Sequence, residues 1–351
     1  MLVPASRERF DGIRDYAVYL ASALAPEQRC LLLTTRDDSC PPVGSRVLAS
    51  WGHLVRGDAP RVLYVHYQPV SWLRRDLPAL IRALAKLRDA GTRVIVIFHE
   101  YQLDAGPSLR RAGARAVFRR LARAIAREAH ALVATYGFVA DGLKEDGPGG
   151  RAPIAVIAVG SNIAPCRPAP DADARTPNAV VMFGQPAGMA PVAVRAAAAA
   201  LRDAGKPPLR WVCRDGDEAL RWLRGAGVPD GSVMRLSSLE APDVSRELSS
   251  ASVALAPNID GVSTRRGTVA ACLQHGLPIV GTGGRATDPV FSDSPAFLLA
   301  PPGDGPAVAS GLLDVLGDAG RRQRMSAEAI RLFDAHLAWP RIARRYVELL
   351  R

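Results

Sequence analysis

The first half of the chain alternates short apolar runs with longer segments of mixed polarity. The apolar runs are rich in Val, Ile and Leu and have the length of strands, as in parallel sheets that are covered on both faces. They are CLLLTT (30–35), RVLYVHY (61–67), RVIVIFHE (93–100) and ALVATY (131–136). Because the segments between them are long enough for crossover helices, this half is predicted to be a doubly wound α/β domain.

A second series of the same kind begins after residue 178. Its strand-like runs are 179–184, 209–214, 232–238, 253–258 and 277–283, with helical patterns at 190–204, 216–226, 242–251 and from Gly267. Between the two series, residues 164–178 read APCRPAPDADARTPN and have no periodicity, which is typical of a linker. We therefore predict two α/β domains. The last stretch of the chain, 336–351, is an amphipathic helix by its apolar spacing.

The charge is high and unevenly distributed. The chain has a formal net charge of +11, and residues 1–165 hold 23 basic and 15 acidic residues, a net charge of +8. A basic half suits nucleic acid, an anionic surface or an anionic substrate, whereas a GC-rich coding sequence alone also favours arginine. Aromatic residues are only 6% and no recognition module is visible, which argues against nucleic acid.

The start of the chain, MLVPASRERFDG, lacks the long apolar region of a secretory signal, and no run of about 18 apolar residues predicts a membrane span. The cysteines are odd in number and have no CxxC spacing. This pattern predicts thiols in a reducing cytoplasm, without a disulfide framework or a zinc site. The five are Cys30, Cys40, Cys166, Cys213 and Cys272.

The segment GVSTRRGT carries the most specific chemistry. It follows the apolar run 253–258 and places Arg265 and Arg266 at the N-terminus of the helix expected from Gly267. That end of a helix favours anions, and guanidinium groups and hydroxyls bind phosphate oxygens. We therefore expect Ser263, Thr264 and the two arginines to bind a phosphate. The alternative is a Ser or Thr cap followed by two solvated arginines. Neither GxGxxG nor GxxxxGK[ST] is present, so a dehydrogenase or a P-loop protein has little support.

Other candidates stand directly after predicted strands, where ligands bind in doubly wound sheets. His99 and Glu100 end one strand, His66 ends its neighbour and Arg214 follows another. Gly12 opens the first helix, where the lack of a Cβ would let a phosphate approach. Histidines hydrogen-bonded to nearby backbone and an ordinary turn glycine are the alternatives. The chain has no DxD, HxxxH or Cys/His cluster, so we expect no metal.

The segment AxVALxPNxDGVSTRRGTxxAxxxHGLPIVGT resembles the donor-site region of family 4 glycosyltransferases with the GT-B fold. GIRDYAVYLASAL, VIVIFHE, AVGSNI and VVMFGQP resemble further family segments in the same order. The C-terminal pattern W-x-x-I-A-x-x-Y is similar to the family helix that crosses back to the first domain. The resemblance implies an α/β fold of two Rossmann-like domains that face a cleft. Residues 1–165 with 336–351 would bind the acceptor, and residues 175–335 would bind the nucleotide sugar.

The resemblance also implies an activity and roles for residues. The enzyme would move a hexose or deoxysugar from a nucleotide-diphosphate sugar to a sugar, natural-product or lipid-linked acceptor, with retention at the anomeric carbon, no metal and no cofactor. The implied catalytic residues are His99, Glu100, Arg265 and Arg266. The implied donor site comprises Gly12, Gly184, Arg214, Ser263, Thr264, Arg265 and Arg266, and the acceptor site comprises His66, His99 and Tyr101.

The chain departs from the family pattern at three places. The two glutamates of the family's Glu-x7-Glu pattern are replaced by Ser263 and Ala271, and the usual lysine is missing from GQPAGMAP. A catalytically inactive protein that binds a sugar nucleotide or a partner is therefore the alternative function.

The segment 108–129 is predicted to be a strongly basic helix. Its arginines are accompanied by a single acid, Glu128, and by a narrow apolar stripe. Such a helix suits peripheral contact with an anionic membrane, although a surface helix of biased composition has the same pattern. The arginines are Arg110, Arg111, Arg115, Arg119, Arg120, Arg123 and Arg127.

Overall fold

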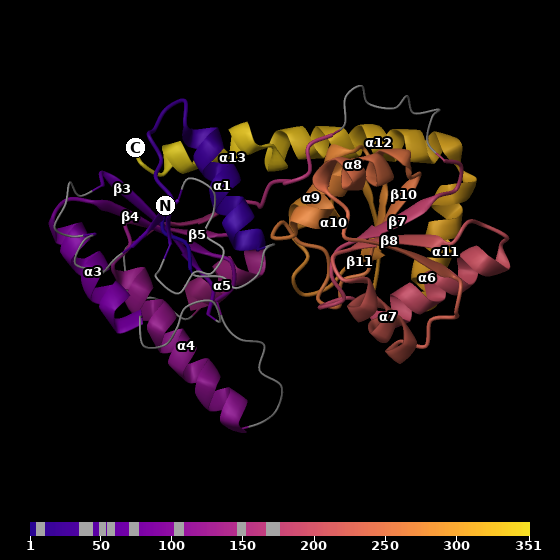
Figure 1. Ribbon diagram of the computed structural model, residues 1–351, viewed down its shortest axis with the longest axis horizontal. Coiled ribbons are helices and arrows are strands. Elements are labelled where there is room, and N and C mark those ends of the chain that lie inside the picture. The colour runs from indigo at the N-terminus through magenta and orange to yellow at the C-terminus, as the bar shows by residue number, and fades with distance from the viewer. Residues whose placement is uncertain are drawn as a thin grey trace. The chain divides into compact units, whose positions relative to one another are not determined.

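The computed structural model describes residues 1–4, 11–34, 45–48, 54, 60–69, 77–101, 109–145, 152–165 and 176–351 (Figure 1). The chain divides into two compact units. Unit 1 consists of Met1–Ala158 and Trp339–Arg351, and unit 2 consists of Val159–Ala338. The change of unit thus falls before the predicted linker at 164–178, because the backbone N–H of Val159 already donates to the carbonyl of Thr264 in unit 2 (2.8 Å). Residues 166–175 of that segment lie outside the described residues.

Unit 1 is built on a parallel sheet. Its described strands β3 (Val62–Tyr67), β4 (Arg93–Phe98), β5 (Ala131–Ala134) and β6 (Ile154–Val156) pair in that order. A second parallel pair, β1 (Leu33–Thr34) with β2 (Arg46–Val47), connects to β3 through Leu2, which bridges Leu33 and Val65. The predicted strands at 61–67, 93–100 and 131–136 are confirmed. The insertion of Leu2 and the strand β6 were not predicted.

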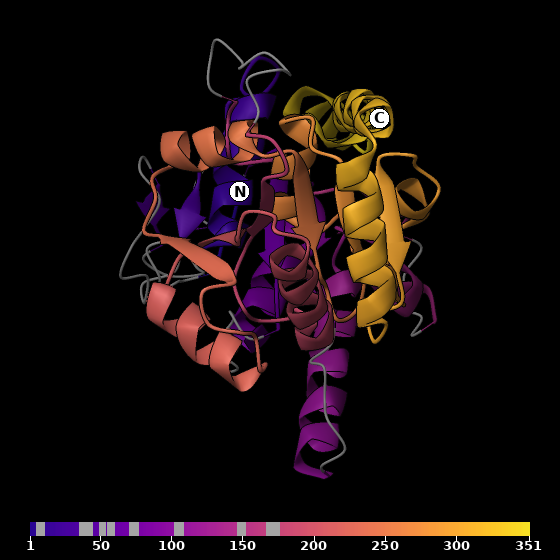
Figure 2. The same cartoon turned by 90° about the vertical axis from the view of Figure 1, so that its right-hand side faces the viewer.

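The described helices of unit 1 include both ends of its chain. They are α1 (Gly12–Leu24), α3 (Leu77–Asp89), α4 (Leu109–Arg127), α5 (Gly137–Glu145) and α13 (Trp339–Glu348). The Asp11 carboxylate caps α1 by accepting the backbone N–H of Ile13 (2.9 Å). The helix α13 packs along α1, where the ring of Trp339 stacks on Tyr19 and meets Tyr16 edge-on. The first turns of α4 extend beyond the sheet of this unit (Figures 1 and 2).

Unit 2 contains a larger parallel sheet. Its described strands are β7 (Val180–Phe183), β8 (Leu209–Cys213), β9 (Val233–Ser237), β10 (Val253–Ala256), β11 (Ile279–Thr282) and β12 (Phe297–Ala300). They pair in the order β12-β11-β10-β7-β8-β9. The chain therefore runs outward from β7 to β9 and then crosses to the other side of β7 with β10. A topological switch point lies between β7 and β10, and ligands bind at the carboxyl ends of strands at such points.

Helices cover both faces of this sheet. Three of them, α6 (Pro191–Asp203), α7 (Gly216–Gly225) and α11 (Gly305–Gly317), enclose the main apolar core around Trp211. The helices α8 (Ala241–Ser250), α9 (Gly267–Gln274) and α12 (Ala319–Leu332) lie on the other side (Figure 1). The short helix α10 (Pro289–Ser292) precedes β12, and the π-helix η2 (Phe333–Leu337) ends the unit. Every strand and helix predicted over 179–283 is present.

Two further predictions concern thiols and membranes. Cys30, Cys213 and Cys272 are free thiols, and burial raises the pKa of Cys272 to about 12, whereas Cys40 and Cys166 lie outside the described residues. Within the described ranges, no helix combines the length and the apolar character that are needed to cross a membrane.

Candidate functional site

The GVSTRRGT segment covers the second part of the connection from β10 to α9 and the first two residues of that helix, at the switch point of the unit 2 sheet. Two neighbouring connections hold it in place. The N–H of Ile259 donates to the carbonyl of Gly188, after β7 (2.9 Å), and the N–H of Ala286, after β11, donates to the carbonyl of Asp260 (2.9 Å). Residues that follow the adjacent strands β11, β10 and β7 thus meet at one edge of the sheet.

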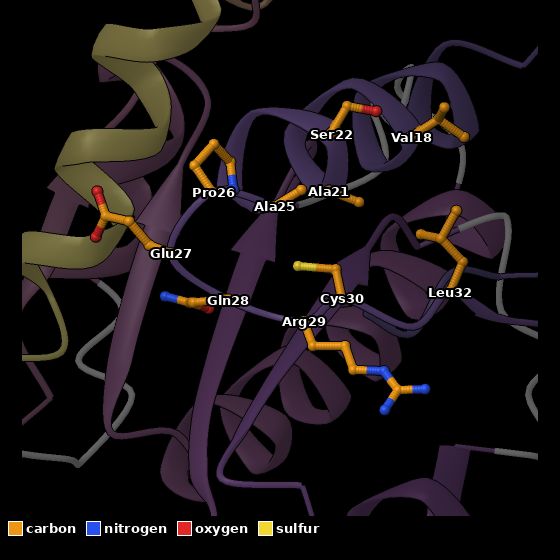
Figure 3. Close-up of a pocket in the computed structure, with 10 residues that line it drawn as sticks. All are labelled: Val18, Ala21, Ser22, Ala25, Pro26, Glu27, Gln28, Arg29, Cys30 and Leu32. Carbon is orange, nitrogen blue, oxygen red and sulfur yellow. The ribbon is translucent and has the colours of Figure 1, made fainter.

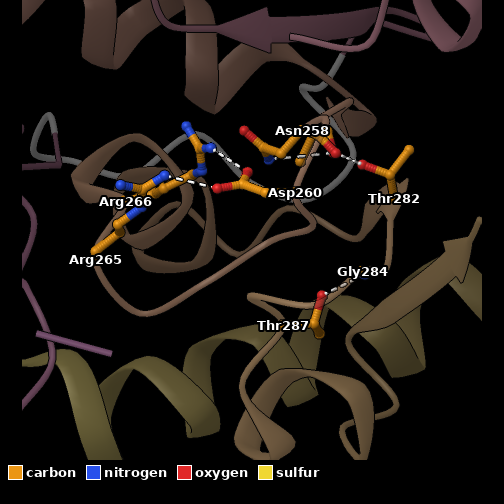
Figure 4. A network of polar contacts seen from close by, with 8 residues as sticks. Asn258, Asp260, Arg265, Arg266, Thr282, Gly284 and Thr287 are labelled. Atoms are coloured by element: carbon orange, nitrogen blue, oxygen red, sulfur yellow. Dashed lines mark hydrogen bonds and ion pairs between the residues drawn. The ribbon is translucent and has the colours of Figure 1, made fainter. Parts of the chain in front are cut away.

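One carboxylate joins the two arginines of this segment. Asp260 Oδ2 accepts from Nη2 of Arg265 and Asp260 Oδ1 accepts from Nη2 of Arg266, each at 2.8 Å (Figure 4). The three side chains are largely buried, with exposed fractions of 21%, 19% and 14% for Arg265, Arg266 and Asp260. Asp260 was not among the site residues predicted from the sequence. The feature that could have indicated it is an acid followed by a glycine, five residues before two adjacent arginines.

The hydroxyl residues of the segment do not cap α9. The N-cap is Arg266, which forms no side-chain cap hydrogen bond. Thr264 instead donates its backbone N–H and its Oγ1 hydroxyl to Oδ2 of Asp288, at 2.7 and 2.9 Å. Ser263 is completely buried, and its hydroxyl has no hydrogen-bond partner among the described residues. The alternative of a Ser or Thr cap is therefore wrong, and a buried hydroxyl remains at the start of the helix.

Glycines permit the close approach of these connections. Gly261 has φ +96°, and a Cβ there would lie 2.2 Å from Oγ1 of Thr287 and 2.4 Å from the backbone N of Gly284. Gly184 has φ +136° directly after β7, and its carbonyl accepts from the indole Nε1 of Trp211 (2.9 Å). The conformation of both positions favours glycine.

Arg214 stands at the end of β8, one strand beyond β7, and its side chain is exposed. Its neighbour Asp215 caps α7 by accepting the N–H groups of Asp217 and Glu218, both at 2.9 Å. The hydrogen bond from Glu218 is the main cause that lowers the pKa of Asp215, and Arg214 adds to it. Arg214 thus lies at the same end of the sheet as the arginine pair, with β7 between the two strands β8 and β10.

In unit 1 the two predicted histidines come together. His66 is the penultimate residue of β3, and His99 follows β4. Because these strands are paired, Nδ1 of His66 lies 3.0 Å from Nε2 of His99. Tyr16 of α1 meets both imidazole rings edge-on, with centroid distances of 5.6 and 5.3 Å. Burial lowers the pKa of His99 to about 4 and that of His66 well below 6.5, so both are neutral at pH 7.

Three other predicted residues of unit 1 have different surroundings. Glu100 is partly exposed and follows His99 directly. Tyr101 is buried against the ring of Phe98. A Cβ at Gly12 would meet no described atom within 4 Å, so crowding in the structure does not account for this glycine.

A hollow of unit 1 is lined by none of these residues. It is lined by the second half of α1 and by the segment 25–32, including Glu27, Arg29 and Cys30 (Figure 3). None of the residues that the sequence singled out as a catalytic or binding residue lines it. The candidate site is therefore defined by the polar residues at the strand ends and not by this hollow.

Comparison with known proteins gives no match to a protein-family model and no match to a curated protein. Solved structures are similar over almost the whole chain. A sucrose-phosphate synthase from Thermosynechococcus elongatus has a TM-score of 0.73 and 15% identity, with 99% of this chain and 97% of that chain covered. HepE from Anabaena, in complex with UDP and glucose, has a TM-score of 0.70 and 13% identity, with 99% and 98% covered.

AviGT4, a glycosyltransferase involved in avilamycin A biosynthesis, has a TM-score of 0.61 and 16% identity, with 99% of this chain and 95% of that chain covered. Identities this low show the fold alone. The chain has the GT-B fold, with two Rossmann-like units, as predicted.

Proposed function

We propose that this protein is a glycosyltransferase of family 4 type that uses a nucleotide-diphosphate sugar as donor. The observation that carries the proposal is the pair Arg265 and Arg266, held together at the start of α9 beside the switch point of unit 2. HepE, which shares the fold, binds UDP and glucose. A diphosphate fits two guanidinium groups, the N–H groups of a helix N-terminus and a buried hydroxyl.

The chemistry that this site supports is departure of the diphosphate. As the bond between the anomeric carbon and the phosphate oxygen breaks, negative charge grows on the diphosphate, and Arg265 and Arg266 stabilise it. The acceptor oxygen forms the new bond on the same face, so the configuration is retained. Its proton passes to the leaving phosphate oxygen. In this proposal the two arginines supply the positive charge, and neither a metal nor a cofactor is required.

Unit 1 would supply the acceptor side of the reaction. His99 and Glu100 follow β4, and His66 fixes the orientation of His99 through the hydrogen bond between their rings. Because His99 is neutral at pH 7, it can position a sugar hydroxyl but is not a cationic acid. Tyr101 would be a further residue of the acceptor site. The acceptor would be a sugar, a natural product or a lipid-linked sugar.

A binding protein without catalysis is the competing function. The positions of the two family glutamates, Ser263 and Ala271, are completely buried, and neither carries an acid. The carboxylate of Asp260 lies in the same connection and contacts both arginines. Turnover of any nucleotide sugar would exclude the binding protein.

A thermal-shift screen with UDP, GDP, ADP, CDP and dTDP tests the proposal first. A ligand that binds only the native state adds about 2.7 kcal/mol to the free energy of unfolding at a hundredfold excess over Kd. One nucleotide should raise the melting temperature, and its sugar derivatives are then assayed for turnover. Absence of any shift would contradict the proposal.

We further propose that α4 contacts anionic lipid at the inner face of a membrane. Arg115, Arg120 and Arg127 of this helix are exposed. Cosedimentation with phosphatidylglycerol vesicles at low salt should be lost when these three arginines become glutamine, whereas Arg202→Gln in unit 2 should have no effect. Equal binding of both variants would contradict a role for α4.

A further inference from the structure

The carboxylate of Asp260 lies between two guanidinium groups. Each of its oxygens accepts a hydrogen bond from a different arginine, Arg265 or Arg266, at the same distance of 2.8 Å (Figure 4). Adjacent arginines repel one another, and each long side chain has many rotamers. A single shared carboxylate restricts both side chains at once, so that they stand side by side before any ligand binds.

The backbone around Asp260 is anchored on three sides. Ile259 is hydrogen-bonded to the carbonyl of Gly188 after β7, and the carbonyl of Asp260 itself accepts from Ala286 after β11. Within its own connection, the N–H of Gly261 donates to the carbonyl of Asn258 (3.1 Å). A Cβ at Gly284 would lie 2.7 Å from the carbonyl oxygen of Asp260, which shows how closely the connections pack. The backbone of Asp260 is therefore held in place, and this limits the positions that its carboxylate can take.

Asp260 has two opposing effects on the site: it weakens the binding of an anion, and it aligns the two arginines. The two guanidinium groups and this carboxylate together carry a formal charge of +1, whereas the arginines alone carry +2. The carboxylate thus weakens the attraction of the site for any bound anion. At the same time it orients donors whose interaction with the leaving group strengthens as charge grows there, and catalysis depends on that orientation.

We propose that Asp260 is a positioning residue that aligns Arg265 and Arg266 for the departing diphosphate and lowers the affinity of the resting site for anions. The inference rests on the proposed function. It predicts that removal of the carboxylate makes anion binding tighter and turnover slower. A residue that only supports the fold would lower both, and a residue that contacts the nucleotide would weaken binding.

The test compares D260N with D304N and with the unaltered protein. Asparagine has the shape of aspartate without the charge. Asp304 is the N-cap of α11 in the same unit, where asparagine caps equally well, so that D304N makes the same change of net charge away from the site. Kd is measured by calorimetry for inorganic pyrophosphate and for the nucleotide diphosphate found in the thermal-shift screen, at two salt concentrations. The donor kcat is measured alongside, together with Tm.

For D260N we expect several-fold tighter and more salt-sensitive binding of both anions, and a kcat lower by about a hundredfold. D304N should match the unaltered protein, and D260E should recover part of the kcat. Unchanged kcat and Kd, or a parallel loss of binding, turnover and Tm, would overturn the proposal. If the unaltered protein turns over no donor but D260N binds pyrophosphate more tightly, the glycosyltransferase assignment fails and the effect of Asp260 on anion affinity stands. If neither protein binds either anion, both fail.

Discussion

The imidazole rings of His66 and His99 are joined by a hydrogen bond of 3.0 Å between Nδ1 of the first and Nε2 of the second. The two residues lie 33 positions apart in the chain and meet because β3 and β4 are paired with His66 opposite Ile97. Tyr16 from α1 packs against both rings. The hydrogen bond needs a proton on only one of the two nitrogens, so two neutral imidazole rings can form it.

The histidine pair predicts that the protein becomes less stable toward unfolding at acidic pH. Burial places the pKa of His99 at about 4 and that of His66 well below 6.5, so the unfolded chain binds more protons than the native chain as the pH falls from 6.5 toward 4. The free energy of unfolding should therefore fall over that range, by at most about 1.4 kcal/mol per pH unit and histidine, and this contribution should be constant above 6.5. Urea denaturation at several pH values measures it.

The matched variants are His99→Gln and His336→Gln. The first removes one of the two histidines whose pKa values are lowered and should flatten the pH dependence, whereas the second changes an exposed histidine in η2 and is the control. Equal slopes in all three proteins would show that the pair does not titrate as predicted.

Arg265→Ala and Arg266→Ala should each lower kcat by ~10²–10³, with a smaller effect on the donor KM, because the charge that they stabilise grows in the transition state. Lysine should restore only part of the rate, since it lacks the planar fork. Arg119→Ala in α4 is the control. Because Asp260 is left with one partner, we expect Tm to decrease slightly. Wild-type turnover in both alanine variants would place the diphosphate elsewhere.

Treatment with EDTA should leave turnover unchanged if the two arginines take the place of a divalent cation. The measurement is initial rate after dialysis against chelator, with and without added Mg²⁺ or Mn²⁺. A loss of rate that either ion restores would show that a metal holds the diphosphate.

Gly261→Ala should destabilise unit 2 strongly. The position combines φ +96° with a Cβ site only 2.2 Å from Oγ1 of Thr287, so the substitution is expected to cost more than about 2 kcal/mol and to displace Asp260. Gly303→Ala is the control, because a Cβ there meets no described atom within 4 Å. Chemical denaturation measures both, and equal stability of the two variants would contradict the geometry.

Tyr346→Phe tests how α13 is held on α1. The hydroxyls of Tyr16 and Tyr346 are buried and lie 2.9 Å apart, so removal of one leaves the other without this partner, at a cost of about 1–3 kcal/mol. Tyr16→Phe should cost a similar amount. The double variant should be more stable than the sum of the two losses predicts, because neither hydroxyl remains. Strict additivity of the two losses would refute the coupling.

Most elements of both units, and the position of the arginines, could be predicted from local patterns in the chain. Apolar runs and helical spacing are local properties, and they indicated β3, β4, β5 and the series from β7 to β11 within a few residues. The helix α9 begins at Gly267, and the two arginines stand at its N-terminus, as predicted. That Arg266 itself is the N-cap was not predicted. Residues 284–335 were not assigned to elements, although they form β12, α11 and α12.

Which of these residues meet depends on the three-dimensional packing and could not be predicted from local patterns. His66 contacts His99 through strand pairing, and Leu2 enters the sheet between Leu33 and Val65; neither contact leaves a periodic signal in the chain. Asp260 lies only five residues from Arg265, yet its contacts with both arginines depend on the positive φ of Gly261 and on the connections packed around it. Local sequence patterns indicate which segments are helices or strands and which of their positions are buried. The contact partners of a side chain depend instead on how segments that are distant in the sequence pack together.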